Sequence, residues 1–225
     1  METVNKEKLL PIITGLFVGV LVLSNILATK MLQYGPFVSD GGTLLFPLSY
    51  IFGDVLTECY GYKASRKVIL TGFFMIILMS FNIWIIGILP SEPNWVFQDA
   101  YNSILMPVPR IVLGSVFGYF SGEFANSFVL SKMKIFTKGK YLWMRTIGST
   151  LVGEFVDSII FVAIAFLGLY PINVLLIMVI SNYIFKTLIE VLFTPLTYKI
   201  IHFVKKFESI DVYDHGINYS PFVIK

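Results

Sequence analysis

The stretch RTIGSTLVGEFVDSIIFVAIAFLGL (Arg145–Leu169) is apolar over most of its length, yet it carries two carboxylates, Glu154 and Asp157, close to its middle. A similar segment, GEFANS (Gly122–Ser127), lies in equally apolar surroundings. An apolar helix of roughly 20 residues crosses the hydrocarbon core of a bilayer, which is about 30 Å thick. The sequence therefore predicts membrane spans with ionisable groups inside them.

The composition supports a membrane protein. Of the 225 residues 56% are hydrophobic and only 14% are charged, whereas a soluble domain has about 25% charged residues. We expect one membrane domain over residues 1–207, followed by a polar cytoplasmic tail over residues 208–225. The single cysteine, Cys59, excludes an intrachain disulfide and a cysteine-rich metal site.

The apolar runs predict an all-α, polytopic bundle of six transmembrane helices. Glycine- and proline-containing turns separate the runs, and Pro195 is expected to bend or end the membrane part of the last one. The predicted spans are Leu9–Thr29, Thr43–Tyr60, Val68–Leu89, Ile111–Leu130, Thr146–Leu167 and Ile172–Phe203.

The cations alternate between the connections. Most of them lie at the two ends of the chain and in the second and fourth connections, whereas the other connections offer only Lys30 and Arg110. The positive-inside rule then places both termini in the cytoplasm. The basic runs are short and divided among loops, so we expect no nucleic-acid partner.

Ionisable groups inside the predicted spans need a structural explanation. A charge at the bilayer centre costs roughly 2.5–3.5 kcal/mol on insertion scales, so these side chains are expected to face the bundle interior. The groups concerned are Asp54, Glu58, Glu123, Glu154, Asp157, Lys186 and Glu190.

The spacing of these groups puts them on shared helix faces. Pairs three or four residues apart lie on one side of a helix, as do Asp54 with Glu58, Glu123 with Asn126, Glu154 with Asp157, and Asn182 with Lys186 and Glu190. With Asn25 and Asn82 added, every span offers an amide or a charge to the interior. A bundle with such a polar seam is a binding cavity or a permeation route.

Structural roles compete with functional ones for several of these residues. Glu58 lies near Lys63 and Arg66 and is suited to an ion pair with them. Glu190 lies one turn from Lys186 and is suited to an internal salt bridge with it. Arg110 and Arg145 stand at span ends, where arginines snorkel toward water. Asn25 and Asn82 are suited to hydrogen bonds between helices.

The sequence offers little support for an enzyme. It has no zinc-protease, nucleophile-elbow or phosphate-loop motif, and an intramembrane hydrolase built on Glu154 and Asp157 would lack a nucleophile–base set. Gly114, Gly118 and Gly122 repeat at four-residue spacing, which favours close helix packing. We expect no cofactor and no metal.

Four segments together resemble the queuosine precursor transporter family, also called the vitamin uptake transporter family. They are LVLSNILATK (Leu21–Lys30), TLLFPLSYIFGDVLTECYGYKASRK (Thr43–Lys67), RIVLGSVFGYFSGEFANSF (Arg110–Phe128) and LWMRTIGSTLVGEFVDSIIFVAIAFLG (Leu142–Gly168). The resemblance implies a six-helix carrier of the bacterial inner membrane. It also implies import of 7-cyano-7-deazaguanine, 7-aminomethyl-7-deazaguanine or queuine for queuosine in tRNA.

The chain departs from the family at two positions: Glu123 and Glu154 stand where such proteins often have glutamine. A guanine-like edge offers N1–H and an amine as donors and a carbonyl as acceptor, so a carboxylate can accept both donors. Asp157 or Glu154 is expected to bind the donor edge. The other substrate-site residues expected are Asn25, Asn126 and Lys186 at the carbonyl and ring nitrogens, Phe46 and Tyr183 stacking on the ring, and Asp54 and Glu123.

Glu58, Arg110, Arg145 and Glu190 are expected to act in gating or ion pairs. The partners expected are the small-molecule substrate and the lipid bilayer, with a homodimer left open. The competing interpretation is the substrate-capture subunit of an energy-coupling-factor vitamin importer, which also has six spans; the segment GLFVGV (Gly15–Val20) is at most a weak equivalent of the contact surface that such a subunit needs.

Overall fold

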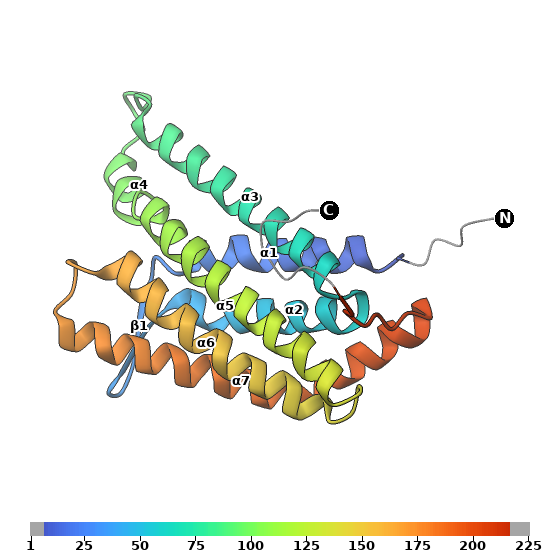
Figure 1. The fold of residues 1–225 in the computed structure, drawn as a ribbon. Helices are drawn as coiled ribbons and strands as arrows, with labels where there is room; N and C mark the ends of the chain where they lie inside the picture. Colours follow the sequence, from blue (N-terminus) through green and yellow to red (C-terminus); the bar gives the residue numbers. More distant parts are fainter. Residues whose placement is uncertain (1–6, 217–225) are drawn as a thin grey trace.

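The chain is described by a computed structural model that covers residues 7–216, apart from the side chains of residues 46 and 47. Long helices lie side by side in a bundle, and a small hairpin lies at one end (Figure 1). In chain order the elements are α1 (Leu10–Leu27), β1 (Met31–Tyr34), β2 (Phe37–Asp40), the 3-10 helix η1 (Gly41–Leu44), α2 (Phe46–Tyr60), α3 (Tyr62–Ile88), α4 (Gln98–Ile104), α5 (Val108–Phe136), α6 (Leu142–Phe166) and α7 (Ile172–Glu208).

Each predicted span overlaps one α-helix of the structure, which confirms the all-α polytopic fold. Five helices are long and apolar enough to cross a membrane. The exception is α2, whose 15 residues extend about 22 Å. It contacts α1, α3, α5 and α7, and Gly42 and Thr43 of η1, which precedes it, are also buried. Irregular backbone is tolerated at membrane depth where protein surrounds it.

Helices α5 and α6 make the closest helix pair in the bundle, as the glycine spacing predicts. A Cβ added at Gly122 would lie 2.7 Å from the carbonyl oxygen of Gly153, and one added at Gly118 would lie 3.1 Å from the carbonyl oxygen of Asp157. Because only glycine permits this approach, the backbones of α5 and α6 touch. The packing brings Glu123 on α5 close to Glu154 and Asp157 on α6.

The hairpin was not predicted, although the turn at its tip was. Strands β1 and β2 pair antiparallel with Tyr34 opposite Phe37, and Gly35 at the turn has a φ of +59°. The hairpin ends at Asp40, which is buried and accepts a hydrogen bond from the Thr43 amide at 3.2 Å. This bond caps η1 and directs the chain back into the bundle.

The structure corrects the expectation for Asn82 and agrees with the bend expected at Pro195. Asn82 is exposed on α3 and donates to the carbonyl oxygen of Leu78 in its own helix, so α3 brings no amide inward at this position. Pro195 does not end α7, which continues to Glu208 with its last turns rising at an angle (Figure 1). Close to the proline, the Thr194 hydroxyl bonds the carbonyl oxygen of Glu190 at 2.9 Å.

The beginning of α1 and the end of α7 lie at the same end of the bundle (Figure 1). The amide of Leu9 donates to the Glu208 carboxylate. The segment after α7 folds back over this end: the Asp214 carboxylate accepts from the Tyr62 amide at 3.0 Å and from the Ser131 hydroxyl at 2.8 Å. We call this end the terminal face, and the opposite end, with the hairpin and α4, the hairpin face.

Candidate functional site

All seven ionisable groups predicted inside the spans face the bundle interior. Each of the seven residues is at most 3% exposed, which confirms the expectation that they face inward. Together with neighbouring polar residues they form three groups, which we name in order from the hairpin face to the terminal face. The cavity cluster contains Asp40, Thr43, Glu154, Asp157, Asn182 and Lys186; the acid cluster contains Asp54, Glu123, Asn126 and Glu190; the ion network contains Glu58, Lys134, Arg145, Lys205 and Asp211.

Lys186 is the centre of the cavity cluster. Its ammonium group bonds Oδ2 of Asp157 and lies 3.6 Å from Oε2 of Glu154. The expected bridge from Lys186 to Glu190 is therefore wrong, because the lysine points toward α6 instead of along its own helix. The second oxygen of Asp157, Oδ1, is buried and has no hydrogen-bond partner in the described part of the chain. It can accept a donor from a ligand.

The hairpin contributes a second carboxylate to the cavity cluster. The Thr43 hydroxyl lies 3.0 Å from Oδ2 of Asp40 and 3.1 Å from Oδ1 of Asn182. The Asn182 amide group donates to Oδ2 of Asp40 at 3.4 Å. Asp40 is thus held by an amide, a hydroxyl and a backbone N–H, all of them uncharged donors.

A small cavity lies between these groups. Its volume of about 20 Å³ has room for one or two water molecules, so the conformation is closed around it. The ring of Phe161 forms one wall, with the Lys186 ammonium 5.9 Å from its centre. The lining residues are Ser24, Ala28, Asp40, Gly42, Thr43, Ser115, Asp157, Phe161 and Lys186.

A larger cleft of about 560 Å³ opens on the hairpin face and shares Ala28 with the cavity. Its size is within the range of ligand pockets, but no carboxylate lines it. Arg110, at its edge, donates to the carbonyl oxygens of Ile164 and Leu167 at the end of α6. The cleft therefore has the space for a ligand, and the cavity beside it has the chemistry to recognise one.

The acid cluster has no cation. Asn126 donates to Oδ1 of Asp54 at 3.1 Å, and the Ser127 hydroxyl donates to Oε1 of Glu123 at 3.2 Å. Within residues 7–216 no lysine or arginine forms an ion pair with Asp54, Glu123 or Glu190. Isolated buried carboxylates are very unfavourable when ionised, so the acids of this cluster need either protons or hydrogen-bond donors.

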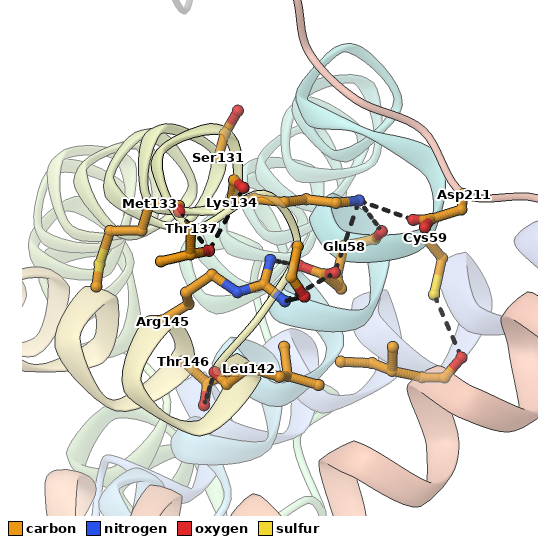
Figure 2. Close-up of polar contacts among 12 residues, drawn as sticks. Glu58, Cys59, Ser131, Met133, Lys134, Thr137, Leu142, Arg145, Thr146 and Asp211 are labelled. Carbon is orange, nitrogen blue, oxygen red and sulfur yellow. Dashed lines mark hydrogen bonds and ion pairs between the residues drawn. The ribbon is translucent and has the colours of Figure 1, made fainter.

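The ion network closes the terminal face. Lys134 and Arg145 both point at Glu58, and Lys134 also reaches Asp211 (Figure 2). The Arg145 guanidinium lies 2.9 Å from one Glu58 oxygen, Lys205 lies 2.8 Å from the other, and Lys134 lies 3.6 Å away. The expected partners of Glu58 were wrong, since Lys63 is exposed and the Arg66 guanidinium lies 5.7 Å from the centre of the Tyr62 ring.

The network joins four helices and the segment that follows α7. Arg145 is buried, so it does not snorkel. Burial raises the pKa of Asp211, but hydrogen bonds from Lys134 and Lys205 outweigh burial and hold the pKa below its usual value. Asp211 therefore stays ionised at neutral pH and ties the segment after α7 to α5 and α7.

The remaining predicted site residues lie elsewhere. Asn25 is buried but donates to the carbonyl oxygen of Leu21 in its own helix. The Tyr183 ring packs on Phe155, which is exposed, and Tyr183 is not among the residues that line the cavity. The side chain of Phe46 lies outside the described residues.

Sequence reasoning missed Asp40, Thr43, Ser24, Ser115 and Phe161. Asp40 precedes Thr43 by three residues, a capping pattern that could have identified it. No group of three or more histidine, cysteine or acidic side chains with metal-ligand geometry occurs in the described part of the chain.

Comparisons with known proteins agree with the fold and the polar interior. The family model described as "Putative vitamin uptake transporter" matches residues 40–200. A Bacillus subtilis (strain 168) protein named "Probable queuosine precursor transporter" is 32% identical over 190 residues, which are 82% of each chain. A Haemophilus influenzae protein with the same name is 26% identical over 130 residues, 58% of this chain and 53% of the relative.

No solved structure matches the chain significantly. The family match extends over most of the described helices and includes all three polar groups except residues at the end of α7 and beyond. The chain therefore belongs to the vitamin uptake transporter family and is a multi-pass membrane transporter.

Proposed function

We propose that this transporter imports queuosine precursors, namely 7-cyano-7-deazaguanine, 7-aminomethyl-7-deazaguanine or queuine, across the bacterial inner membrane for the modification of tRNA. The names of the two relatives support this substrate class. The observation that carries the proposal is the pairing of Asp157 with Lys186 beside an enclosed cavity.

The pair is suited to a guanine-like edge. The unpartnered Oδ1 of Asp157 can accept the N1–H and exocyclic amine donors, and the Lys186 ammonium can donate to the neighbouring carbonyl. Phe161 offers its ring as a wall for the flat heterocycle. An adenine-like base would leave buried donors or acceptors unmatched, at about 1–3 kcal/mol each.

The two ends of the bundle support transport by alternating access. The cavity is too small for a heterocycle in this conformation, and the cleft on the hairpin face is the adjoining space into which it can open. The ion network holds the terminal face closed. Release on that side requires Glu58 to separate from Arg145 while helices move around a central site. We place the terminal face, with both termini, in the cytoplasm.

The test is uptake of labelled 7-aminomethyl- and 7-cyano-7-deazaguanine into proteoliposomes that contain only this protein, with and without a proton gradient. We expect uptake by the wild type and a loss of at least about tenfold in Asp157→Asn, which keeps the shape but removes the charge. Asp99→Asn is the matched control, because Asp99 is exposed on α4. If the wild-type protein took up neither compound, the substrate assignment would be contradicted.

A second candidate is a capture subunit of an energy-coupling-factor vitamin importer. One observation favours it: a Cβ added at Gly15 or at Gly19 on α1 meets nothing within 4 Å. Two glycines four residues apart on an open face allow a partner helix to approach closely. Co-purification with ATPase subunits, together with uptake only in their presence, would select this candidate over a carrier that works alone.

A further inference from the structure

Asp40 is a buried carboxylate that lines the cavity and forms no ion pair in the described residues, although the charge of Lys186, which also lines the cavity, acts on it. It is 3% exposed, and its hydrogen-bond donors are the Thr43 amide, the Thr43 hydroxyl and the Asn182 amide group. No lysine or arginine in the described range pairs with it. A carboxylate in a dry site is unfavourable unless a cation or a proton accompanies it.

The charges around the cavity do not balance. Three carboxylates, Asp40, Glu154 and Asp157, surround one cation, Lys186, and the lysine is already engaged by Asp157 and Glu154. When the three carboxylates are ionised, the negative charge that Lys186 does not match lies at the hairpin side, where Asp40 stands. A ligand that brings a positive charge to that side would complete the site, whereas at the Lys186 side the same charge would be repelled.

We propose that Asp40 binds a positively charged substituent of the substrate, so that the transporter selects the 7-deazaguanine that carries a primary ammonium, 7-aminomethyl-7-deazaguanine, over the neutral 7-cyano compound. This inference rests on the proposed function and decides between its substrates. Asp157 and Lys186 bind the ring edge that both compounds share, and Asp40 binds the substituent in which the two compounds differ.

The discrimination has a direct chemical basis. An ammonium donates a charge-assisted hydrogen bond to a carboxylate, which is about twice as strong as one between neutral groups. A nitrile has no donor, and its nitrogen lone pair would face the Asp40 oxygens. A site built to satisfy a donor rejects an analogue that lacks it, because the buried acceptor is then left unmatched.

The test measures the ratio of uptake of the aminomethyl to the cyano compound in proteoliposomes, for the wild type and for Asp40→Asn. Asparagine caps a helix as well as aspartate does, so the bond to the Thr43 amide and the fold are retained. We expect a wild-type ratio above about ten, and a ratio lowered about tenfold in the variant while uptake of the cyano compound changes less than about threefold. Asp99→Asn should keep the wild-type ratio.

The outcomes separate this inference from the proposed function. Wild-type uptake of neither compound overturns both. Uptake of both with the same ratio in wild type and Asp40→Asn overturns only the role of Asp40. If the variant loses uptake of both compounds equally, Asp40 has only a structural role, and the inference is also overturned. Asp40→Ser, a second neutral capping residue, replaces the asparagine variant if that variant does not accumulate in the membrane, and the same ratios decide.

Discussion

Lys186 shows how a single residue sets the arrangement of the interior. It is the lysine that the described structure places inside the bundle at the level of the cavity, and it holds Asp157 and Glu154 toward one another. The sequence identified the lysine and both acids as inward-facing, because charges at membrane depth have few other places to lie. It did not identify which acid pairs with the lysine. Glu190 is nearer along the chain, and the pairing depends on how α6 and α7 pack against each other.

We predict that Lys186→Met destabilises the protein by about 3–5 kcal/mol, because removal of one partner leaves buried carboxylates without a cation. Thermal unfolding in detergent, compared with Lys199→Met on the exposed face of α7, measures the effect. The double variant Lys186→Met with Asp157→Asn should recover part of the loss. A melting temperature equal to that of Lys199→Met would show that the pair does not contribute to stability.

At the scale of elements, hydropathy located the five long helices and the shorter α2, and the spacing of glycines located the contact between α5 and α6. The sequence did not predict the hairpin or α4 because both are short and their residues do not alternate strongly between apolar and polar. Asp40 was missed for the same reason: its burial depends on the hairpin returning the chain into the bundle. Local patterns cannot show such a return.

We predict that Gly122→Ala destabilises the α5–α6 contact by about 1–3 kcal/mol, as overpacking does. The added methyl group would lie 2.6 Å from the Tyr50 hydroxyl oxygen and 2.7 Å from the Gly153 carbonyl oxygen. Gly19→Ala is the control, since nothing lies within 4 Å of its added Cβ; it should be neutral or stabilising by up to about 1 kcal/mol. Thermal unfolding of the two purified variants makes the comparison, and similar losses in both would contradict close packing at Gly122.

At the scale of the whole molecule, the buried polar side chains form three groups that follow one another along the bundle. The cavity cluster lies nearer the hairpin face, the acid cluster follows it, and the ion network lies at the terminal face. The sequence predicted that the acids would converge, but not that they would divide into a cavity, a group without cations and a network rich in them. That division depends on the partners that each helix presents, including Lys134 and Asp211, which lie far apart in the chain.

The distribution of cations predicts the orientation of the bundle in the membrane. In a Cys59→Ala background, we predict that a cysteine replacing Glu92, in the loop before α4, reacts with a membrane-impermeant maleimide in intact spheroplasts. A cysteine replacing Lys138, between α5 and α6, should react only after the membrane is opened. The reverse pattern would place the terminal face outside and require release on the opposite side.

The most direct test of the central claim, that Asp157 and the cavity beside it form the site for a planar heterocycle, is equilibrium binding to the purified protein. The labelled ligand is 7-aminomethyl-7-deazaguanine, and the proteins compared are the wild type, Asp157→Asn and the exposed control Asp99→Asn. We predict that Asp157→Asn raises the Kd at least about tenfold, because a charge-assisted bond to the ring edge is lost, and that the control binds as the wild type does. Equal affinity of all three proteins would contradict the account.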